Sequence, residues 1–170
     1  EGEVYADVLT TYFIPSPTMM ARANVYKVLG GYDEQLVYED FDFWVRSSRE
    51  FKYGFLPKKL MKIRRNINSM SSGWYKKGDH QLHSTYLVCR KALLLNRTER
   101  ERKALAWRAK YELRQSVFSE NQKETKLFYE LLKEMRGAHW TDTFLYRLGK
   151  LNLPLAPIRA YYHRLRYSAF

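Results

Sequence analysis

Hydrophobic and polar positions divide the chain into a first part of mixed character and a second part with the character of helices. In the first part, Phe41, Trp44, Val45 and Ser48 fall on one face of a helix. The acidic residues just before and among them suit a helix start, because the positive end of the helix dipole favours negative charge. We therefore expect a helix that begins within residues 39–42.

The segment before this helix contains a turn signal. Gly30-Gly31 follows residues 23–29, and glycine commonly occupies the position just beyond the end of a helix. The stretch from Pro17 therefore predicts a short strand that leads into a helix over residues 23–29. Two further strands are predicted from alternating residues at 52–57 and 59–65.

The second part of the chain is nearly free of glycine and proline up to Gly137. Thr98 is followed three positions later by Glu101, which is a pattern typical of a helix N-terminus because the two residues can cap each other's backbone N–H groups. We expect helices over residues 79–95, 98–118 and 122–136, the last two separate or joined as one broken helix, and a shorter helix around residues 140–149.

The composition is that of a folded domain. Of 170 residues, 45% are hydrophobic and 16% are aromatic, which supplies a core and excludes extensive disorder. No apolar run reaches the roughly 18–20 residues that span a bilayer, and the opening EGEVYADVLT shows no secretory signal. The first residue is glutamate, and we expect the chain to be a piece of a longer protein. The single cysteine, Cys89, cannot form an internal disulfide and fits a reducing compartment.

The net charge of +12 is concentrated in the second half of the chain. Residues 1–89 contain 12 Lys/Arg and 10 Asp/Glu, a net of +2, whereas residues 90–170 contain 18 and 8, a net of +10. This distribution indicates an anionic partner: lipid headgroups, nucleic acid or a phosphorylated substrate.

The stretch VYEDFDFWVR gathers Glu39, Asp40 and Asp42 among aromatic residues. One interpretation is that all three are helix-start acids on a solvated face. The other is that one carboxylate is a general base, held at a fixed angle by the helix start beneath the Gly30-Gly31 turn. The residues alone leave both interpretations open.

The order of motifs from Pro17 to Ser71 resembles the C-terminal half of the catalytic domain of family 2 glycosyltransferases, which have the GT-A fold. The matching stretches are SPTMMARANVYKVLGGYDEQL, YEDFDFWVRSS and FLPKKLMKIRRNINSMSS. That family shows a strand rich in small residues and methionine, Gly-Gly-aromatic-Asp-Glu, a Glu-Asp pair, and a strand ending in Arg-x-His-x-x-Ser-x-Ser. The resemblance covers about 55 of the 170 residues, and its specificity lies in the combined order.

The resemblance implies an α/β fold in which residues 1–78 are the acceptor-side, C-terminal half of a GT-A catalytic domain and residues 79–170 are a basic, mainly α-helical extension. Asp40 would be the general base of an inverting transfer, supported by Glu39. Gly30, Gly31 and Tyr32 would form the turn that shapes the substrate pocket. Trp44 and Arg46 would lie on the helix behind the base, where Arg46 would orient a carboxylate. Arg64, Ser69 and Ser71 would lie on the strand and loop that close over the nucleotide diphosphate.

The cofactor implied by the resemblance is a divalent metal, Mg²⁺ or Mn²⁺, that stabilises the departing diphosphate. Asn66 stands where many family members carry a metal-binding histidine, and its carbonyl oxygen suits Mg²⁺ better than Mn²⁺. The family's Asp-x-Asp metal motif has no match upstream of Gly30, because Asp40-Phe41-Asp42 matches the base motif instead. We therefore expect most metal ligands to lie in an N-terminal half outside these residues, and the 170 residues alone to be inactive.

Three other features have a structural and a functional interpretation. His80 and His83 could share a helix face toward a metal, but only Asp79 lies at matching spacing, which favours surface or packing histidines. Cys89 lies in an apolar segment that favours a buried thiol. Residues 146–170 contain five Lys/Arg and no acid, which fits either a basic cap packed on the domain or an element at an anionic membrane surface.

Two functions of different classes stay open. The first is part of a glycosyltransferase that moves a sugar from a nucleotide-sugar donor to a glycan or lipid-linked acceptor, in cell-surface polysaccharide synthesis, in the cytoplasm or at the inner face of the membrane. The second is a basic helical module that binds nucleic acid or an anionic membrane, for which Asp40 would be dispensable. The resemblance favours the first and makes nucleic acid the less expected partner.

Overall fold

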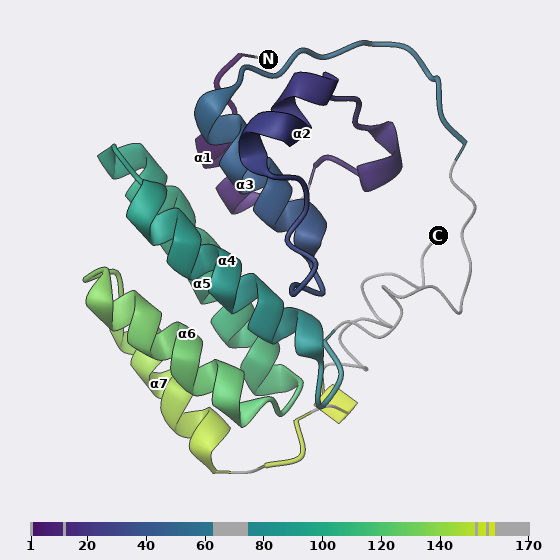
Figure 1. The fold of residues 1–170 in the computed structure, drawn as a ribbon. Coiled ribbons are helices and arrows are strands. Elements are labelled where there is room, and N and C mark those ends of the chain that lie inside the picture. Colours follow the sequence, from purple (N-terminus) through teal and green to yellow (C-terminus); the bar gives the residue numbers. More distant parts are fainter. Residues whose placement is uncertain (1, 12, 63–74, 152, 156, 159–170) are drawn as a thin grey trace.

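The computed structural model describes residues 2–11, 13–62, 75–151, 153–155 and 157–158, and these residues form a helical structure (Figure 1). Among the described helices, none is both long and apolar enough to cross a membrane. The helices in chain order are α1 (Tyr5–Thr10), the 3-10 helix η1 (Ser16–Thr18), α2 (Ala23–Leu29), α3 (Glu39–Glu50), α4 (His80–Leu95), α5 (Glu99–Phe118), α6 (Gln122–Glu134) and α7 (Trp140–Lys150).

The long helices α4 and α5 form the centre of the structure. Helices α1, α2 and α3 lie on one side of this pair, and α6 and α7 lie on the other (Figure 1). Helix α5 packs against α1, α4, α6 and α7, whereas α3 packs mainly against α4 and α1. The two outer groups of helices are therefore joined through α4 and α5.

One connected hydrophobic core runs through these helices. Helix α5 contributes Leu105, Ala109 and Leu113, which recur at intervals of four residues and are fully buried. Each fully buried large apolar side chain stabilises the fold by about 1.5–3 kcal/mol. The core residues of the outer groups include Leu9, Phe41, Phe43 and Val45 on α1 and α3, and Phe128, Leu131 and Leu132 on α6.

A buried ion pair joins α1 and α3 to α5. The Arg108 guanidinium donates to the Leu9 carbonyl at 3.0 Å and to a Glu112 carboxylate oxygen at 3.2 Å. The same guanidinium lies 5.0 Å from the centre of the Phe41 ring. Burial raises the pKa of Glu112, although the positive charge of Arg108 opposes this shift. Arg108 thus provides a buried polar link from α5 to α1 and α3.

The expected α/β fold is wrong, because the described residues contain no strand. The strand predicted after Pro17 does include extended backbone at Met19 (φ −90°, ψ 136°), and Phe51, just before the second predicted strand, is extended as well (φ −130°, ψ 149°). The only ladder contact of the predicted strands within the described chain is an isolated bridge between Gly2 and Tyr53, with N–O distances of 2.7 and 2.9 Å. Alternating residues predict extended backbone, whereas a strand also needs a neighbouring strand to bond to. Residues 63–65 of the third predicted strand lie outside the described residues.

The helix predictions are confirmed to within a few residues. The expected helix over 23–29 is α2, and the acidic residues at 39–42 open α3. Helices α5 and α6 are separate, because the chain turns between them at Glu120, which has a φ of 61°. The Asn121 side chain fixes this turn by accepting from the Gly78 N–H at 2.7 Å and donating to the Lys76 carbonyl at 2.8 Å.

The start of α5 is a capping box that also bonds to α3. The Thr98 hydroxyl accepts from the Glu101 N–H at 3.3 Å, and the Glu101 carboxylate accepts from the N–H groups of Thr98 and Arg97 at 3.1 and 2.6 Å. The Arg49 guanidinium lies 2.9 Å from the same carboxylate. Burial alone would raise the pKa of Glu101, but the Arg97 N–H and the Arg49 charge outweigh it, and the pKa of Glu101 is lowered.

We expect Glu101→Gln to destabilise the protein by about 1–2 kcal/mol at pH 7, because it removes the charge that Arg49 and the helix start favour. The lowered pKa means that this stabilisation is present above the ordinary pKa of 4.5 and is lost as pH falls through the folded-state pKa. Urea denaturation at pH 7 and near pH 3 should therefore show a difference from wild type that shrinks with acid. Glu99→Gln, at an exposed position of the same turn, is the control. An equal difference at both pH values would contradict the prediction.

Candidate functional site

The turn between α2 and α3 has a shape that requires glycine. Gly30 and Gly31 have φ values of 72° and 78°, in the left-handed region that other residues rarely adopt. Gly30 ends α2, and the Gly31 N–H bonds back to the Tyr26 carbonyl at 2.9 Å. The two glycines thereby direct the chain sharply from α2 toward the start of α3.

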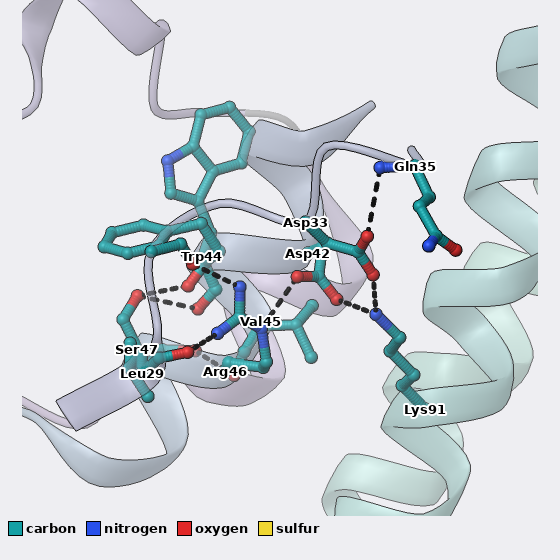
Figure 2. Close-up of polar contacts among 12 residues, drawn as sticks. Leu29, Asp33, Gln35, Asp42, Trp44, Val45, Arg46, Ser47 and Lys91 are labelled. Atoms are coloured by element: carbon teal, nitrogen blue, oxygen red, sulfur yellow. Dashed lines mark hydrogen bonds and ion pairs between the residues drawn. The ribbon is translucent and has the colours of Figure 1, made fainter. Parts of the chain in front are cut away.

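Arg46, on α3, stabilises this turn by hydrogen bonds to its backbone carbonyls. Its guanidinium donates to the Leu29 carbonyl at 2.7 Å and to the Gly31 carbonyl at 2.8 Å. Its Nε also donates to the Asp42 carboxylate at 2.7 Å (Figure 2). Arg46 therefore orients a carboxylate and two backbone carbonyls, and each of its three guanidinium nitrogens has a protein partner.

Lys91, on α4, joins the same network. Its ammonium group donates to Asp42 at 2.8 Å and to Asp33 at 2.7 Å (Figure 2). Burial alone would lower the pKa of Lys91, but the bonds to the two carboxylates outweigh it and raise the pKa. The Lys91 bond and the Gln35 N–H lower the pKa of Asp33. The network thus connects the glycine turn, α3 and α4.

The three clustered carboxylates have different surroundings. Asp42 is 1% exposed and is neutralised by Arg46 and Lys91, so it belongs to the interior of the fold. Asp40 and Glu39 are only half-buried. The Ser16 hydroxyl donates to one Asp40 oxygen at 3.0 Å, which fixes the direction of this carboxylate. Asp40 is therefore accessible as well as oriented.

Tyr32 lies beside these two accessible acids. Its ring is 4.8 Å from that of Phe43 and 5.8 Å from that of Tyr26, and it is 38% exposed. Burial, a hydrogen bond with Tyr26 and the nearby negative charges of Asp40 and Glu39 raise the pKa of Tyr32. The phenol therefore stays protonated at physiological pH and can donate a hydrogen bond.

The structure thus places Tyr32 directly after the glycine turn and within electrostatic reach of Glu39 and Asp40. It places Trp44 elsewhere: this side chain is 3% exposed and packs edge-on against Tyr38, with ring centres 6.1 Å apart. Trp44 therefore supports the site from inside. The predicted contacts Arg64, Asn66, Ser69 and Ser71 lie outside the described residues.

The sequence interpretation misses four residues of this site. It gives Ser16, Asp33 and Lys91 no role in a site, and it groups Asp42 with the other helix-start acids. The spacing of Asp42 and Arg46, four positions apart, is a sequence signal for a helix ion pair. Lys91 and Ser16 gave no comparable signal, because their partners are 49 and 24 residues away in the chain.

A concave region lies at the starts of α4 and α6, away from Asp40. It has a volume of about 390 Å³ and includes His80, His83 and Glu124 in its lining. His83 Nδ1 is 3.4 Å from a Glu124 carboxylate oxygen, so this histidine has a protein partner. Within the described part of the chain, no group of three or more His, Cys, Asp or Glu side chains could hold a metal.

Cys89 is a core residue, as the sequence predicted. It is fully buried on α4. Burial raises the pKa of its thiol to about 12, so the group is protonated at physiological pH. This environment is that of an inert packing residue.

Comparisons with known proteins leave the family of this chain open: no family model, no curated protein and no solved structure matches it.

The division between Asp40 and Asp42 can be tested by stability measurements. We expect Asp42→Asn to lower the free energy of unfolding by about 2–3 kcal/mol, because it removes a buried charge from two cationic partners that are themselves partly exposed. Asp40→Asn keeps an oxygen for Ser16 and should change the free energy of unfolding by less than about 0.5–1 kcal/mol. Urea denaturation at pH 7 measures both values. Equal losses in the two variants would show that the assignment of roles is incorrect.

Proposed function

We propose that this chain is the acceptor side of an inverting glycosyltransferase in which Asp40 is the general base. The observation that carries the proposal is the contrast between two neighbouring acids. Asp42 is buried and neutralised, whereas Asp40 is accessible and held by Ser16 at 3.0 Å. A general base needs this combination of a fixed direction and access to the proton it removes.

In the proposed reaction, a hydroxyl of the acceptor attacks the anomeric carbon of a nucleotide-diphosphate sugar. The bond from the anomeric carbon to the diphosphate oxygen breaks as the new glycosidic bond forms, and configuration inverts. The hydroxyl proton goes to the Asp40 oxygen that Ser16 does not hold. The electron pair of the broken bond leaves with the diphosphate.

The residues around Asp40 suit an acceptor that is a sugar. Tyr32 offers a partly exposed aromatic face on which a sugar ring can stack, and a phenol that can donate to its oxygens. Glu39 adds a second carboxylate that can accept from sugar hydroxyls. Gly30, with no side chain, leaves the backbone of the turn open on the outer side.

The sugar-nucleotide donor and the metal would be bound by other residues. The described residues offer no set of ligands for Mg²⁺ or Mn²⁺, so they do not fit that cofactor by themselves. We therefore assign no step of the reaction to a metal held by the described residues. Residues that bind the nucleotide would come from outside this part of the chain.

The test is glycosyltransferase activity of the full-length protein. Release of nucleotide diphosphate from a panel of sugar nucleotides, with Mg²⁺ or Mn²⁺, would name the donor. We expect Asp40→Asn to lower kcat by about 10²-fold or more, because the amide cannot accept the hydroxyl proton. The control is Glu34→Gln, an exposed acid in the loop that leads to α3.

Equal kcat in wild type and Asp40→Asn would remove Asp40 from the mechanism. Circular dichroism and urea denaturation of the same variant show whether a loss of activity has a folding cause. Absence of turnover with every donor, together with salt-sensitive binding to nucleic acid, would favour the basic binding module instead.

A further inference from the structure

The inner face of helix α7 packs against α5 and α6. Gly149 lies so close to α5 and α6 that an added Cβ would be 3.1 Å from a Thr125 methyl and 3.3 Å from a Val117 methyl. Asp142 is buried, accepts from the His139 N–H at 2.8 Å and lies 3.6 Å from the Lys110 ammonium. These contacts determine which residues of α7 face outward.

The outward face of α7 is apolar and aromatic. Trp140 and Phe144 of α7, and Leu151 directly after it, are 71%, 60% and 65% exposed, and their spacing of four and seven residues places them on one side of the helix. Arg147 and Lys150 are exposed beside this line. A surface helix of a globular domain ordinarily turns its polar side outward, so this arrangement is reversed. We call these five residues the α7 face.

The acids on α7 and on the adjacent α6 are paired with basic side chains. The only acid of α7, Asp142, is buried against Lys110. The exposed acids Glu130 and Glu134 of the adjacent α6 each have a basic partner, Lys126 and Arg90. The α7 face therefore combines apolar side chains with uncompensated positive charge.

We propose that the α7 face docks on an anionic lipid bilayer. Tryptophan and phenylalanine would enter the boundary between headgroups and acyl chains, and Arg147 and Lys150 would contact anionic headgroups. Charge complementarity selects this partner, because an apolar protein surface would gain little from the flanking cations. Helix α7 lies on the far side of α4 and α5 from α3, so docking would leave Asp40 uncovered (Figure 1). The proposal is independent of the glycosyltransferase function.

The test is sedimentation of the 170-residue chain with vesicles of phosphatidylcholine and phosphatidylglycerol, and with phosphatidylcholine alone. We expect binding to the anionic vesicles that weakens with salt. The double variant Trp140→Ala/Phe144→Ala should weaken binding by about tenfold or more, since both rings leave water on docking. Arg147→Gln and Lys150→Gln should each weaken it by about fivefold.

The matched control is Leu94→Ala/Phe55→Ala, which removes one aliphatic and one aromatic side chain at positions 86% and 73% exposed outside α7. We expect this variant to bind vesicles like wild type. Equal binding by the α7 variants and wild type, or no binding by wild type, would overturn the proposal. Self-association of the lipid-free chain in sedimentation velocity, abolished by Trp140→Ala/Phe144→Ala, would assign the face to a second copy instead.

Discussion

The bonds of Asp42 with Arg46 and Lys91 are the interaction on which the candidate site depends. The carboxylate is buried at the first turn of α3, where its charge would be costly without partners. Arg46 uses its remaining donors on the carbonyls of the glycine turn, and Lys91 brings in α4 and Asp33. Asp42 thereby fixes the glycine turn, α3 and α4 relative to one another. The position of the accessible Asp40, two residues earlier on α3, depends on this arrangement.

This arrangement explains why acidic and aromatic residues are gathered in a basic chain. Phe41, Phe43 and Trp44 form the part of α3 that packs inward, and they leave only a few positions of the first turn near solvent. Asp42 falls among the inward positions and is satisfied by cations. Asp40 falls at the edge of the packed face, beside Tyr32 and Ser16. The half-buried acids therefore precede an unbroken run of buried residues, 41–45, at the start of α3.

Local signals predicted much of the helical structure, whereas interactions distant in sequence were missed. Thr98 and Glu101 marked the start of α5, and the glycine pair marked the end of α2, because caps depend on residues within one turn. The strand predictions failed because pairing depends on a neighbouring strand that a local pattern cannot reveal. The role of Lys91 could not be predicted either, since its two partners are 49 and 58 residues away. Within the site, the resemblance indicated Tyr32, Glu39 and Asp40 as neighbours, but it could not separate exposed Tyr32 from buried Trp44.

The long separation between Lys91 and its partners also bears on how the protein folds. Closing a loop of about 50 residues carries an entropic cost that must be met before the network forms. The glycine turn and the first turn of α3 would therefore reach their final geometry late, after α4 has docked. In the native state, a local opening that detaches α4 would release both segments together. The backbone amides of the glycine turn and of the first turn of α3 would then exchange with solvent as one cooperative unit, controlled by a helix about 50 residues further along the chain.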